Sequence, residues 1–390
     1  MYKKILFCLD NSDSANRGVD TGLNIARGFS ASVTGCHVYA ARLHNDRFRQ
    51  MEGGLPPEYQ KEEILKNQRE VHDSLITKGL KIISDSYLAP FLAKVKSAGL
   101  DGLGVSREGK NFDELVKETN EGGYDLVVMG SLGLGKTETS RIGSVTERVA
   151  RRVRTDLFIS KDTSNSSGSI TVAIDGSPSS FGGLLSAIKL SKALNLKIEA
   201  ISAFDPDFHQ TAFRSIAGIL SEEAGRVFRF KEQEQLHDAI IDKGLQRIYR
   251  EHLSTASDMA DKNNVYLKTT LLSGKPSNEI IKHVRKTNPF LLVLGRIGAH
   301  SSAGLDIGST TENCLREALC DVLISSKEFT PLINKSGGIE WDGEAGNILT
   351  SIPSFARPIV RNMVEDAARK NGILRITASF MRTIRKDMEG

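Results

Sequence analysis

The chain has 390 residues and a mass of 42.6 kDa, a length that predicts two or three domains and a sizeable core. With 39% hydrophobic and 26% charged residues, the composition is that of a globular protein and excludes a disordered or fibrous chain. A net charge of +4, from 52 basic and 48 acidic side chains, is too small to indicate a nucleic-acid partner.

The sequence offers no segment for a membrane span or a secretion signal. Its apolar runs, such as Phe290–Leu294, are far shorter than the roughly 20 residues of a membrane helix. The first apolar stretch reaches Asp10 without a small-residue cleavage site, which is typical of a strand and not of a signal peptide. We therefore expect a cytoplasmic protein without a membrane partner.

The cysteines and histidines give no metal-binding pattern. The cysteines lack CxxC spacing, the histidines form no HExxH pair, and the first two cysteines lie inside apolar runs. We expect buried, reduced thiols in preference to a disulfide or a zinc site. The four residues are Cys8, Cys36, Cys314 and Cys320.

In chain order, short apolar runs alternate with longer stretches of helical period. The predicted elements are a strand at Lys4–Leu9, a helix at Ser14–Gly28, a strand at Ser32–Tyr39, a helical stretch at Lys61–Lys96, a strand at Gly102–Val105, a helix at Asp113–Thr119, a strand at Leu126–Met129, a helix at Ser144–Val153 and a strand at Leu157–Ser160. This order predicts an α/β domain with an open, mostly parallel five-stranded sheet and flanking helices. Ligands of such sheets bind at the carboxyl ends of the strands.

The same order returns in the second half of the chain, because the sequence contains an internal duplication. Identical residues recur throughout at an offset of 165. Examples are Asp10 with Asp175, Gly109-Lys110 with Gly274-Lys275, His72-Asp73 with His237-Asp238, and Asp156 with Asp321. The period equals a whole domain, so we predict two tandem domains at residues 1–162 and 168–327, each with its own five-stranded sheet, and a third, small helical domain at 339–390.

A glycine pattern follows the fourth strand of each copy. The first copy has Gly130, two residues, Gly133, nine residues and then Gly143-Ser144. The second copy repeats this spacing with Gly295, Gly298 and Gly308-Ser309. Glycines at a strand exit let the backbone approach a ligand closely and expose N–H groups.

The pattern also predicts a helix start beside each glycine loop. Ser144 with Glu147, and Ser309 with Glu312, match the S-x-x-E capping box. A helix N-terminus with free amides next to a glycine loop is an anion site, so we interpret each copy as a phosphate cradle. The alternative is a loop followed by an ordinarily capped helix, but the exact repetition favours the phosphate site.

A competing motif overlaps the first copy. Residues 130–137 also satisfy the G-x4-G-K-T pattern of a P-loop. A P-loop helix would begin at Lys136-Thr137, whereas the segment 137–140 is polar and unpatterned and the second copy has no Lys-Thr. We therefore expect no P-loop, although Lys136 could still touch a phosphate.

Both copies resemble the universal stress protein family, whose nucleotide motif is G-2x-G-9x-G-(S/T), over about residues 1–327. The resemblance implies an adenine nucleotide alpha hydrolase-like fold that binds ATP, with Mg²⁺ as its companion ion. In ATP-binding members, the glycines and the final Ser or Thr hold the phosphates, an Asp after the first strand lies near the adenosine, and a residue ending the second strand lines the adenine pocket. Carried over, these roles fall on Asp10, Val38, Gly130, Gly133, Gly143 and Ser144, and on Asp175, Ala203, Gly295, Gly298, Gly308 and Ser309.

Two details leave the role of these aspartates and of one repeated pair open. The second copy has the family's Asp-Gly-Ser at Asp175, whereas Asn11 follows Asp10, and either Asp could instead cap the helix that follows it. The repeated His72-Asp73 is an adjacent pair, and adjacent helix residues point about 100° apart, so we attribute it to helix packing or to contacts between the two copies, and not to catalysis.

The residues after a Gly/Ser-containing linker at 334–338 do not repeat. Pro358 and Gly372 frame a helix of about 13 residues, and Ile376–Met388 could form another. The stretch resembles the small C-terminal domain of the light-independent protochlorophyllide reductase B subunit in its W-x2-E-A-x3-L-x2-I-P-x3-R run, which begins at Trp341. The cluster-ligating cysteines of that reductase are lacking, so we expect a helical module of unknown ligand that docks on the tandem domains or on a partner. Arg357 and Arg361 are either its contact residues or solvated helix charges.

The functional hypothesis is an ATP-binding tandem universal stress protein that acts as a nucleotide-dependent adaptor in stress response or signalling. No nucleophile, base and acid recur together in both copies, so we expect binding and assign no catalytic residue. The alternatives are a slow ATPase, a tail-dependent redox or tetrapyrrole role, and a scaffold with empty sites whose tail binds a partner. A homo-oligomer stays open.

Overall fold

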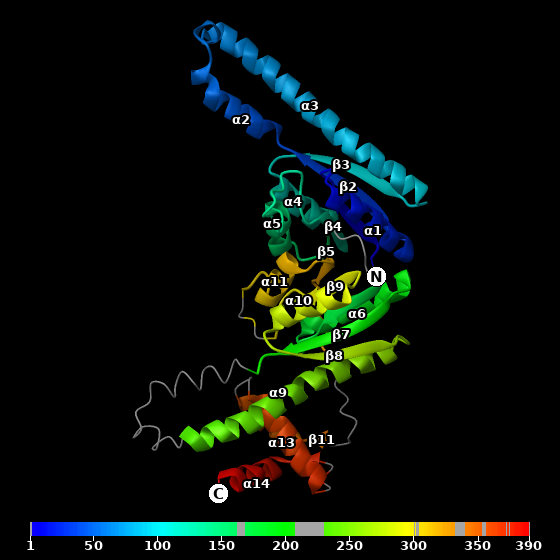
Figure 1. The fold of residues 1–390 in the computed structure, drawn as a ribbon, viewed down its shortest axis with the longest axis vertical. Coiled ribbons are helices and arrows are strands. Elements are labelled where there is room, and N and C mark those ends of the chain that lie inside the picture. The colour runs from blue at the N-terminus through cyan, green and yellow to red at the C-terminus, as the bar shows by residue number, and fades with distance from the viewer. Residues whose placement is uncertain are drawn as a thin grey trace. The chain divides into compact units, whose positions relative to one another are not determined.

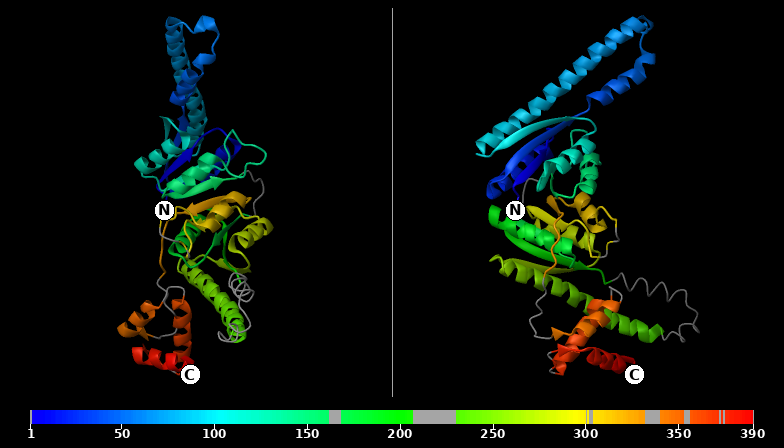
Figure 2. Two further views of the ribbon diagram at one scale, coloured as in Figure 1. Left: turned by 90° about the vertical axis from the view of Figure 1, so that its left-hand side faces the viewer. Right: turned by 180° about the vertical axis from the view of Figure 1, so that it is seen from behind.

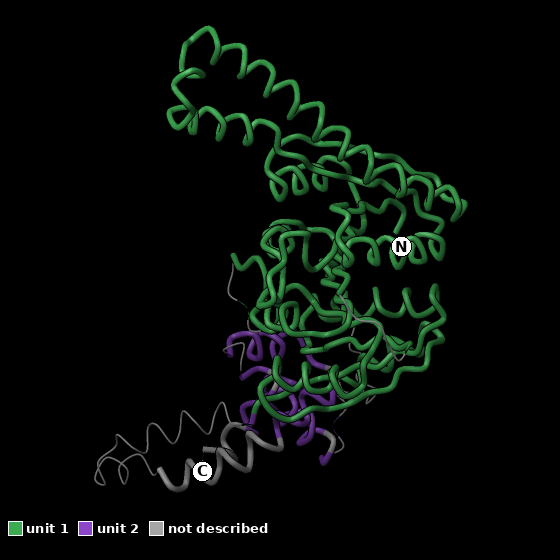
Figure 3. Tube along the Cα trace, turned by 45° about the horizontal axis from the view of Figure 1, so that its top comes forward, with its two compact units in different colours: residues 1–205, 252–331 green, residues 206–251, 332–390 purple. Residues whose placement is uncertain are grey.

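The computed structural model divides into two compact units, residues 1–205 with 252–331 and residues 206–251 with 332–390 (Figure 3). It describes residues 2–161, 168–206, 230–299, 301, 304–331, 340–352, 356–371, 373 and 375–389. The predicted linker at 334–338 lies outside these ranges. Figure 1 shows the elements in chain order.

The first repeat follows the predicted alternation of strands and helices. Its elements are β1 (Lys4–Cys8), α1 (Asp13–Phe29), β2 (Ser32–Tyr39), α2 (Ala41–Met51), the 3-10 turns η1 (Glu52–Gly54) and η2 (Pro57–Tyr59), α3 (Glu62–Ser97), β3 (Gly102–Glu108), α4 (Asn111–Gly122), β4 (Leu126–Gly130), α5 (Ser144–Arg152) and β5 (Asp156–Ser160). Every strand and helix predicted for this repeat is present, with ends shifted by at most four residues. Helix α2 was not predicted.

The second repeat has the same order of elements in its described residues. They are β6 (Ser169–Ala173), α6 (Pro178–Leu194), β7 (Lys197–Phe204), α9 (Phe230–Asp261), β8 (Leu267–Ser273), α10 (Pro276–Thr287), β9 (Leu291–Gly295), α11 (Ser309–Glu317) and β10 (Asp321–Ser325). The α/β architecture of parallel strands and covering helices is therefore confirmed for both repeats.

The ten strands form one continuous sheet, where the sequence predicted two separate five-stranded sheets. Its order is β3-β2-β1-β4-β5-β10-β9-β6-β7-β8. Within each repeat all pairs are parallel, and the two halves join through an antiparallel pair in which Phe158 of β5 lies opposite Leu323 of β10. The repeats are joined because β5 and β10 are apolar strands that would otherwise each be an exposed sheet edge.

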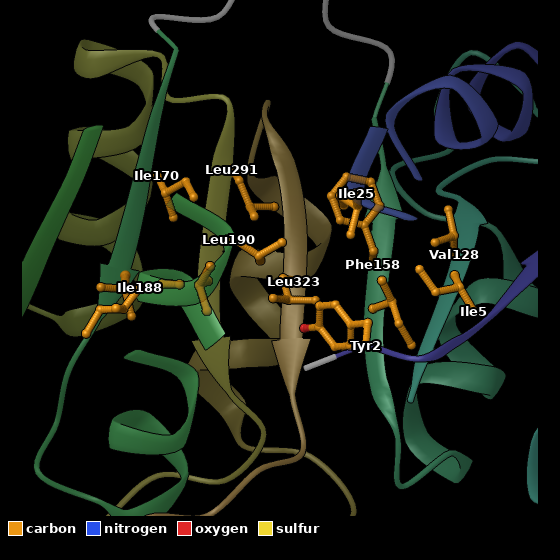
Figure 4. Close-up of a cluster of buried hydrophobic side chains, with 14 of the residues drawn as sticks. Tyr2, Ile5, Ile25, Val128, Phe158, Ile170, Ile188, Leu190, Leu291 and Leu323 are labelled. Carbon is orange, nitrogen blue, oxygen red and sulfur yellow. The ribbon is translucent and has the colours of Figure 1, made fainter. Parts of the chain in front are cut away.

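Both faces of the sheet are covered by helices, as a parallel sheet requires. One apolar layer, part of which Figure 4 shows, lies under α1, α3, α6 and the end of α9 and includes Leu23, Phe91 and Leu184. The other lies under α4, α5, α10 and α11 and includes Val149 and Leu315. The strand residues between these layers are apolar on both sides, which is why the strands are continuous apolar runs in the sequence.

Buried polar contacts repeat across the junction of the two halves. The amide of Ser326 donates to Asp156 Oδ1 at 2.8 Å, and the amide of Lys161, 165 residues earlier, donates to Asp321 Oδ1 at 2.7 Å. The hydroxyl of Tyr2 also donates to Asp156 at 2.8 Å. Each repeat therefore supplies an aspartate that accepts a hydrogen bond from the chain just beyond the other repeat's last strand.

Helices α2 and α3 form an arm that projects beyond strand β3, as both views in Figure 2 show. The carboxyl half of α3 packs on the sheet through Leu88, Phe91 and Val95, which are buried. The amino half packs on α2, where the ring of Phe48 stacks on His72 with centroids 4.1 Å apart, and its Arg69 forms an ion pair with Glu52 of η1 at 2.6 Å. The helical prediction for this stretch is correct, and its repeated His pair serves packing in the first copy.

The second unit has its own small core. Its C-terminal elements are β11 (Glu340–Trp341), α12 (Gly343–Ser351), α13 (Arg357–Lys370), β12 (Arg375–Ile376) and α14 (Ala378–Glu389). The apolar side chains of Val364, Ala368 and Ile376 are buried between these helices and the two short strands. The two predicted helices correspond to α13 and α14, and α12 and the strand pair were not predicted.

Two expectations about the chain can be compared directly with the structure. All four cysteines lie buried as thiols, and burial raises the pKa of Cys36 and Cys314 to about 12. None of the helices in the described ranges has the length and hydropathy that a bilayer crossing needs.

The junction makes stability depend on pH through Asp321. Burial raises the pKa of this carboxyl from an ordinary value of 3.8 to about 6. As the pH falls from 7 to 4 the folded state therefore takes up the proton before the unfolded state does, and the free energy of unfolding of the wild type should rise relative to Asp321→Asn. The expected gain is up to about 3 kcal/mol, measured by urea unfolding at several pH values. Parallel pH profiles of the two proteins would contradict this assignment.

Candidate functional site

The glycine motifs lie where the topology predicts a ligand site. Gly130 ends β4 and Asp10 follows the adjacent strand β1, so both stand at the carboxyl edge of the first half-sheet. Gly295 at the end of β9 and Asp175 after β6 hold the same positions in the second half. Because β5 and β10 pair antiparallel, the strands of the two halves run in opposite directions. The two candidate sites, each at the carboxyl ends of its own strands, therefore lie on opposite sides of the ten-stranded sheet along the strand direction.

Asp10 is held by the start of helix α1. Its Oδ1 accepts hydrogen bonds from the amide of Ser12 at 3.0 Å and from the hydroxyl of Ser12 at 2.6 Å. The hydroxyl of Ser12 in turn accepts from the amide of Ala15, so Ser12 and not Asp10 is the N-cap of the helix. The aspartate therefore orients the capping serine, and its second oxygen, Oδ2, points toward the glycine loop.

The second repeat reproduces this geometry. Asp175 Oδ1 accepts from the amide and the hydroxyl of Ser177 at 3.0 and 2.6 Å, and Ser177 caps α6. Asp175 Oδ2 accepts from the amide of Ala299 in the glycine loop at 2.9 Å. The departure at Asn11, where the second repeat has Gly176, does not change this framework, because Asn11 has a φ of 60° and Gly176 one of 84°.

The first glycine of each motif is required by packing. A Cβ on Gly130 would lie 2.6 Å from the amide nitrogen of Ala15, and one on Gly295 would lie 2.7 Å from the carbonyl carbon of Ser179. Both neighbours are backbone atoms in the first turns of α1 and α6. These glycines let the strand end pass close to the helix start, which places the helix and the loop side by side.

The second glycine of each motif faces the aspartate. A Cβ on Gly133 would lie 2.8 Å from Asp10 Oδ2, and a Cβ on Gly298 would lie 2.8 Å from Asp175 Oδ2. Gly133 and Gly298 thus leave room between the loop and the carboxylate. This is a role at the candidate site itself, in contrast to the packing role of the first glycine.

The third glycine begins the helix that follows the loop. The amide of Gly143 donates to the carbonyl of Ser131 at 2.7 Å, and Thr146 Oγ1 donates to the carbonyl of Gly130 at 2.8 Å. The second repeat repeats both bonds with Gly308 and Thr311. The first turn of α5 and of α11 is therefore anchored to the strand end, and its leading amides, which have no partner within the helix, stand beside the glycine loop.

The predicted capping boxes are wrong in detail. Helix α5 begins one residue earlier than a box would require, with Gly143 as N-cap and Ser144 as the exposed first residue. Glu147 instead pairs with Arg316 of the other repeat. Helix α11 has Gly308 as its N-cap in the same way, and there Glu312 pairs with Arg151 at 2.5 Å.

The two site helices are thereby linked across the repeat boundary. The first turn of α5 contacts the last turn of α11, and the first turn of α11 contacts the last turn of α5. The two helices therefore run antiparallel, and their dipoles attract. The exposed hydroxyls of Ser144 and Ser309 remain on the outer side of the first turns. A serine at the first helical position can still donate to an anion there, so the correction changes the capping group and not the anion site.

The structure argues against the P-loop interpretation of residues 130–137. The segment around Lys136-Thr137 forms turns, and the helix begins at Ser144. The side chain of Lys136 is 47% exposed and its Nζ lies 4.0 Å from Asp13 Oδ2. Lys136 therefore stands near the start of α1, at the rim of the same edge.

Val38 and Ala203 are the next-to-last residues of β2 and β7, the second strands of their repeats, and both are buried. Sequence reasoning missed their neighbour His37, whose imidazole is 9% exposed and packs edge-on against Tyr87 at 4.9 Å. Burial lowers the pKa of His37, while the nearby Asp10 carboxylate opposes that shift. The duplication gave no signal for His37, because the second repeat has Ser202 at the equivalent position.

Among the described residues, no group of three or more His, Cys, Asp or Glu side chains is placed to hold a metal ion.

In the tail, Arg357 Nε donates to the carbonyl of Ile352, and Arg361 pairs with the buried Glu365 at 3.0 Å. Both candidate tail arginines thus take part in contacts within their own unit.

Comparison with known proteins agrees with these features. The profile of the universal stress protein family matches residues 1–161 and 167–326, and that of the proto-chlorophyllide reductase 57 kD subunit matches residues 341–385. Universal stress protein MJ0531 of Methanocaldococcus jannaschii is 25% identical over 158 residues, covering 40% of this chain and 81% of that protein. Universal stress protein YxiE of Bacillus subtilis is 24% identical over 153 residues, covering 39% of this chain and 93% of that protein.

A solved structure supports the fold over both repeats. The crystal structure of a universal stress protein from Archaeoglobus fulgidus has a TM-score of 0.53 at 15% identity, covering 84% of this chain and 98% of that chain. At this identity the likeness concerns the fold alone. Together with the family profiles it confirms the two resemblances that the sequence motifs indicated.

The distinct roles of the glycines can be separated by stability. Gly130→Ala should lower the free energy of unfolding by about 1 to 3 kcal/mol, because its Cβ would press on the backbone of α1. Gly135→Ala, in the same loop with no atom within 4 Å of its Cβ, should change it by less than about 0.5 kcal/mol. Denaturant unfolding of the two variants checks this, and equal midpoints would refute the packing role.

Proposed function

Because the chain belongs to the universal stress protein family over residues 1–161 and 167–326, we propose that it binds ATP in both repeats and acts as a nucleotide-dependent adaptor in stress response or signalling. The observation that carries the proposal is the duplicated geometry of loop, aspartate and helix start. Two copies of the chain segment, 165 residues apart, place the same glycine, the same carboxylate and the same helix N-terminus at equivalent points.

The proposed roles follow from the chemistry of each group. Amides at the start of α5 and the hydroxyl of Ser144 would bind the phosphates, since a helix N-terminus attracts negative charge. Gly133 and Gly143 would give the phosphates access to the backbone, and Gly130 holds the loop against α1. Gly298, Gly308 and Ser309, with Gly295 as the packing glycine, would have these roles in the second repeat.

The adenosine end would lie near the first two strands. Oδ2 of Asp10, on the side of the carboxylate that faces the loop, would accept from the sugar, and the end of β2 at Val38 would border the base. Asp175 and Ala203 would act likewise in the second repeat. A triphosphate carries several negative charges, so Mg²⁺ would accompany it as a counter-ion held mainly by the phosphates and water.

The geometry favours binding over hydrolysis. Asp10 and Asp175 are the carboxylates that face the second glycine of each loop, and in each the Oδ1 oxygen already accepts two hydrogen bonds from the capping serine. A general base must take a proton from an attacking water, and a carboxylate committed to a helix cap is a weak candidate. We therefore propose an adaptor whose contacts with other proteins depend on whether it holds the nucleotide.

The same proposal divides the chain by function. Residues 1–162 and 168–327 would be the nucleotide domains, and residues 339–390 a module that docks on a protein partner. The tail unit is compatible with such a role because it has its own core, and its Trp341 Nε1 is held by the buried Glu365 at 3.1 Å.

The binding proposal is tested by isothermal titration of the full chain with ATP and Mg²⁺. We expect two sites per chain, one site in Gly133→Val or Gly298→Val, and none in the double variant, because each valine would push against the Asp10 or Asp175 carboxylate. Gly135→Ala is the matched control and should bind as the wild type. Unchanged binding by the double variant would refute the site assignment.

A phosphate-release assay distinguishes the adaptor from an ATPase. With ATP and Mg²⁺ in excess, we expect no phosphate release above the uncatalysed background from protein that binds ATP in the titration. Steady release that disappears in the double glycine variant would contradict the adaptor proposal and support a slow ATPase.

A further inference from the structure

Helix α3 has two apolar faces, and the fold uses one of them. Leu65, Leu88 and Phe91 belong to the face that packs on α2 and the sheet. A second set of aliphatic side chains is exposed to solvent on the projecting arm: Ile64 is 36% exposed, Val71 55%, Leu75 67% and Ile82 68%. Ile83, at 43%, and Leu92, at 36%, are also exposed on α3. This many large aliphatic residues on one helix exceeds the scattered apolar residues of an ordinary surface.

Ile64, Val71, Leu75 and Ile82 form a single stripe. Their separations of seven, four and seven residues put them on one side of an α-helix. A shallow depression of about 570 Å³ runs along this side between Asn67 and Ile82. Gly79 also lies on it, and a Cβ there would meet no atom within 4 Å, so a partner helix could approach closely.

The stripe is symmetric about position 73. Ile64 and Ile82 lie nine residues on either side of this position, and Val71 and Leu75 lie two residues on either side. Asn67 and Gly79 are related in the same way, six residues from the centre. A sequence with this symmetry is complementary to itself in an antiparallel arrangement, which is the property of an isologous twofold interface.

We propose that this stripe is an interface between two copies of the chain, formed by antiparallel packing of their α3 helices about a twofold axis at residue 73. Ile64 then meets Ile82 of the second copy, and Val71 meets Leu75 of the second copy. Asn67 and Gly79 of the second copy lie at the same level but on opposite sides of the line of contact. The inference does not depend on nucleotide binding.

The charges beside the stripe fit the same register. In this register Glu63 lies two residues along the axis, about 3 Å, from Lys81 of the second copy. Glu70 lies at the same axial distance from Lys78 of the second copy. A parallel pair would place each residue beside its own copy, so Glu70 would meet Glu70 and Lys78 would meet Lys78. Lys81 also contacts Asp85 of its own chain at 3.4 Å, so its attraction to Glu63 is shared.

Sedimentation velocity of the full chain over about 1 to 100 μM tests the proposal, because this range covers the weak, reversible association expected of small interfaces. We expect a monomer–dimer equilibrium whose dissociation constant rises at least tenfold in Val71→Glu/Leu75→Glu. Leu319→Glu, at a leucine that is 52% exposed outside the arm, is the control and should dimerise as the wild type. A wild-type protein that stays monomeric, or a double variant that dimerises normally, would overturn the proposal.

Cross-linking tests the direction of the pair independently. The four natural cysteines are buried, so an added surface cysteine reports on the interface. A mixture of Ile64→Cys and Ile82→Cys chains, whose cysteines would face each other across the stripe, should form disulfide-linked dimers under mild oxidation, and neither variant should do so alone. Efficient cross-linking of each variant with itself, and not with the other, would show a parallel pair and overturn the antiparallel assignment.

Discussion

The antiparallel pairing of β5 with β10 is the constraint on which the rest of the two-repeat unit depends. It joins two parallel half-sheets into one sheet of ten strands and removes the edge that each half would otherwise expose. It also makes the strands of the second half run opposite to those of the first, so the two candidate sites lie at opposite strand ends of the sheet. Two ligands would therefore bind far from a common pocket, each with its own loop, aspartate and helix.

The same reversal couples the two site helices. Because α5 and α11 run antiparallel beside the junction, the acidic first turn of each meets the basic last turn of the other through Glu147, Arg151, Glu312 and Arg316. Arg296, in the second glycine loop, donates to the carbonyl of Ala150 in α5 at 2.6 Å. The loop of one site thus touches the helix of the other, and the two sites share a connected set of contacts.

The sequence allowed the prediction of what each repeat determines by itself. Apolar runs and helical periods gave the order of elements, and the offset of 165 gave the tandem arrangement and the paired glycine motifs. Helix α2 was missed because its composition is strongly polar and only Ala41 in it is buried. The joined sheet was missed because the pairing of Phe158 with Leu323 is a contact between repeats, which no pattern within one repeat encodes.

The site was predictable as a set of positions but not as a set of roles. The motif treats its three glycines alike, whereas Gly130 is needed for backbone packing and Gly133 for the space beside Asp10. The capping box failed for a related reason: Glu147 has a stronger partner in Arg316, a charged group from the other repeat. Sequence spacing could reveal neither the packing of Gly130 on α1 nor the pairing of Glu147 with Arg316, because both are tertiary contacts.

A crystal structure of the full chain grown with a non-hydrolysable ATP analogue and Mg²⁺ tests the central claim most directly. The account predicts phosphate density at both sheet edges, with oxygens within hydrogen-bonding distance of the first-turn amides of α5 and α11 and with the base beside the ends of β2 and β7. Analogue density away from both glycine loops, or none at saturating concentration, would contradict it.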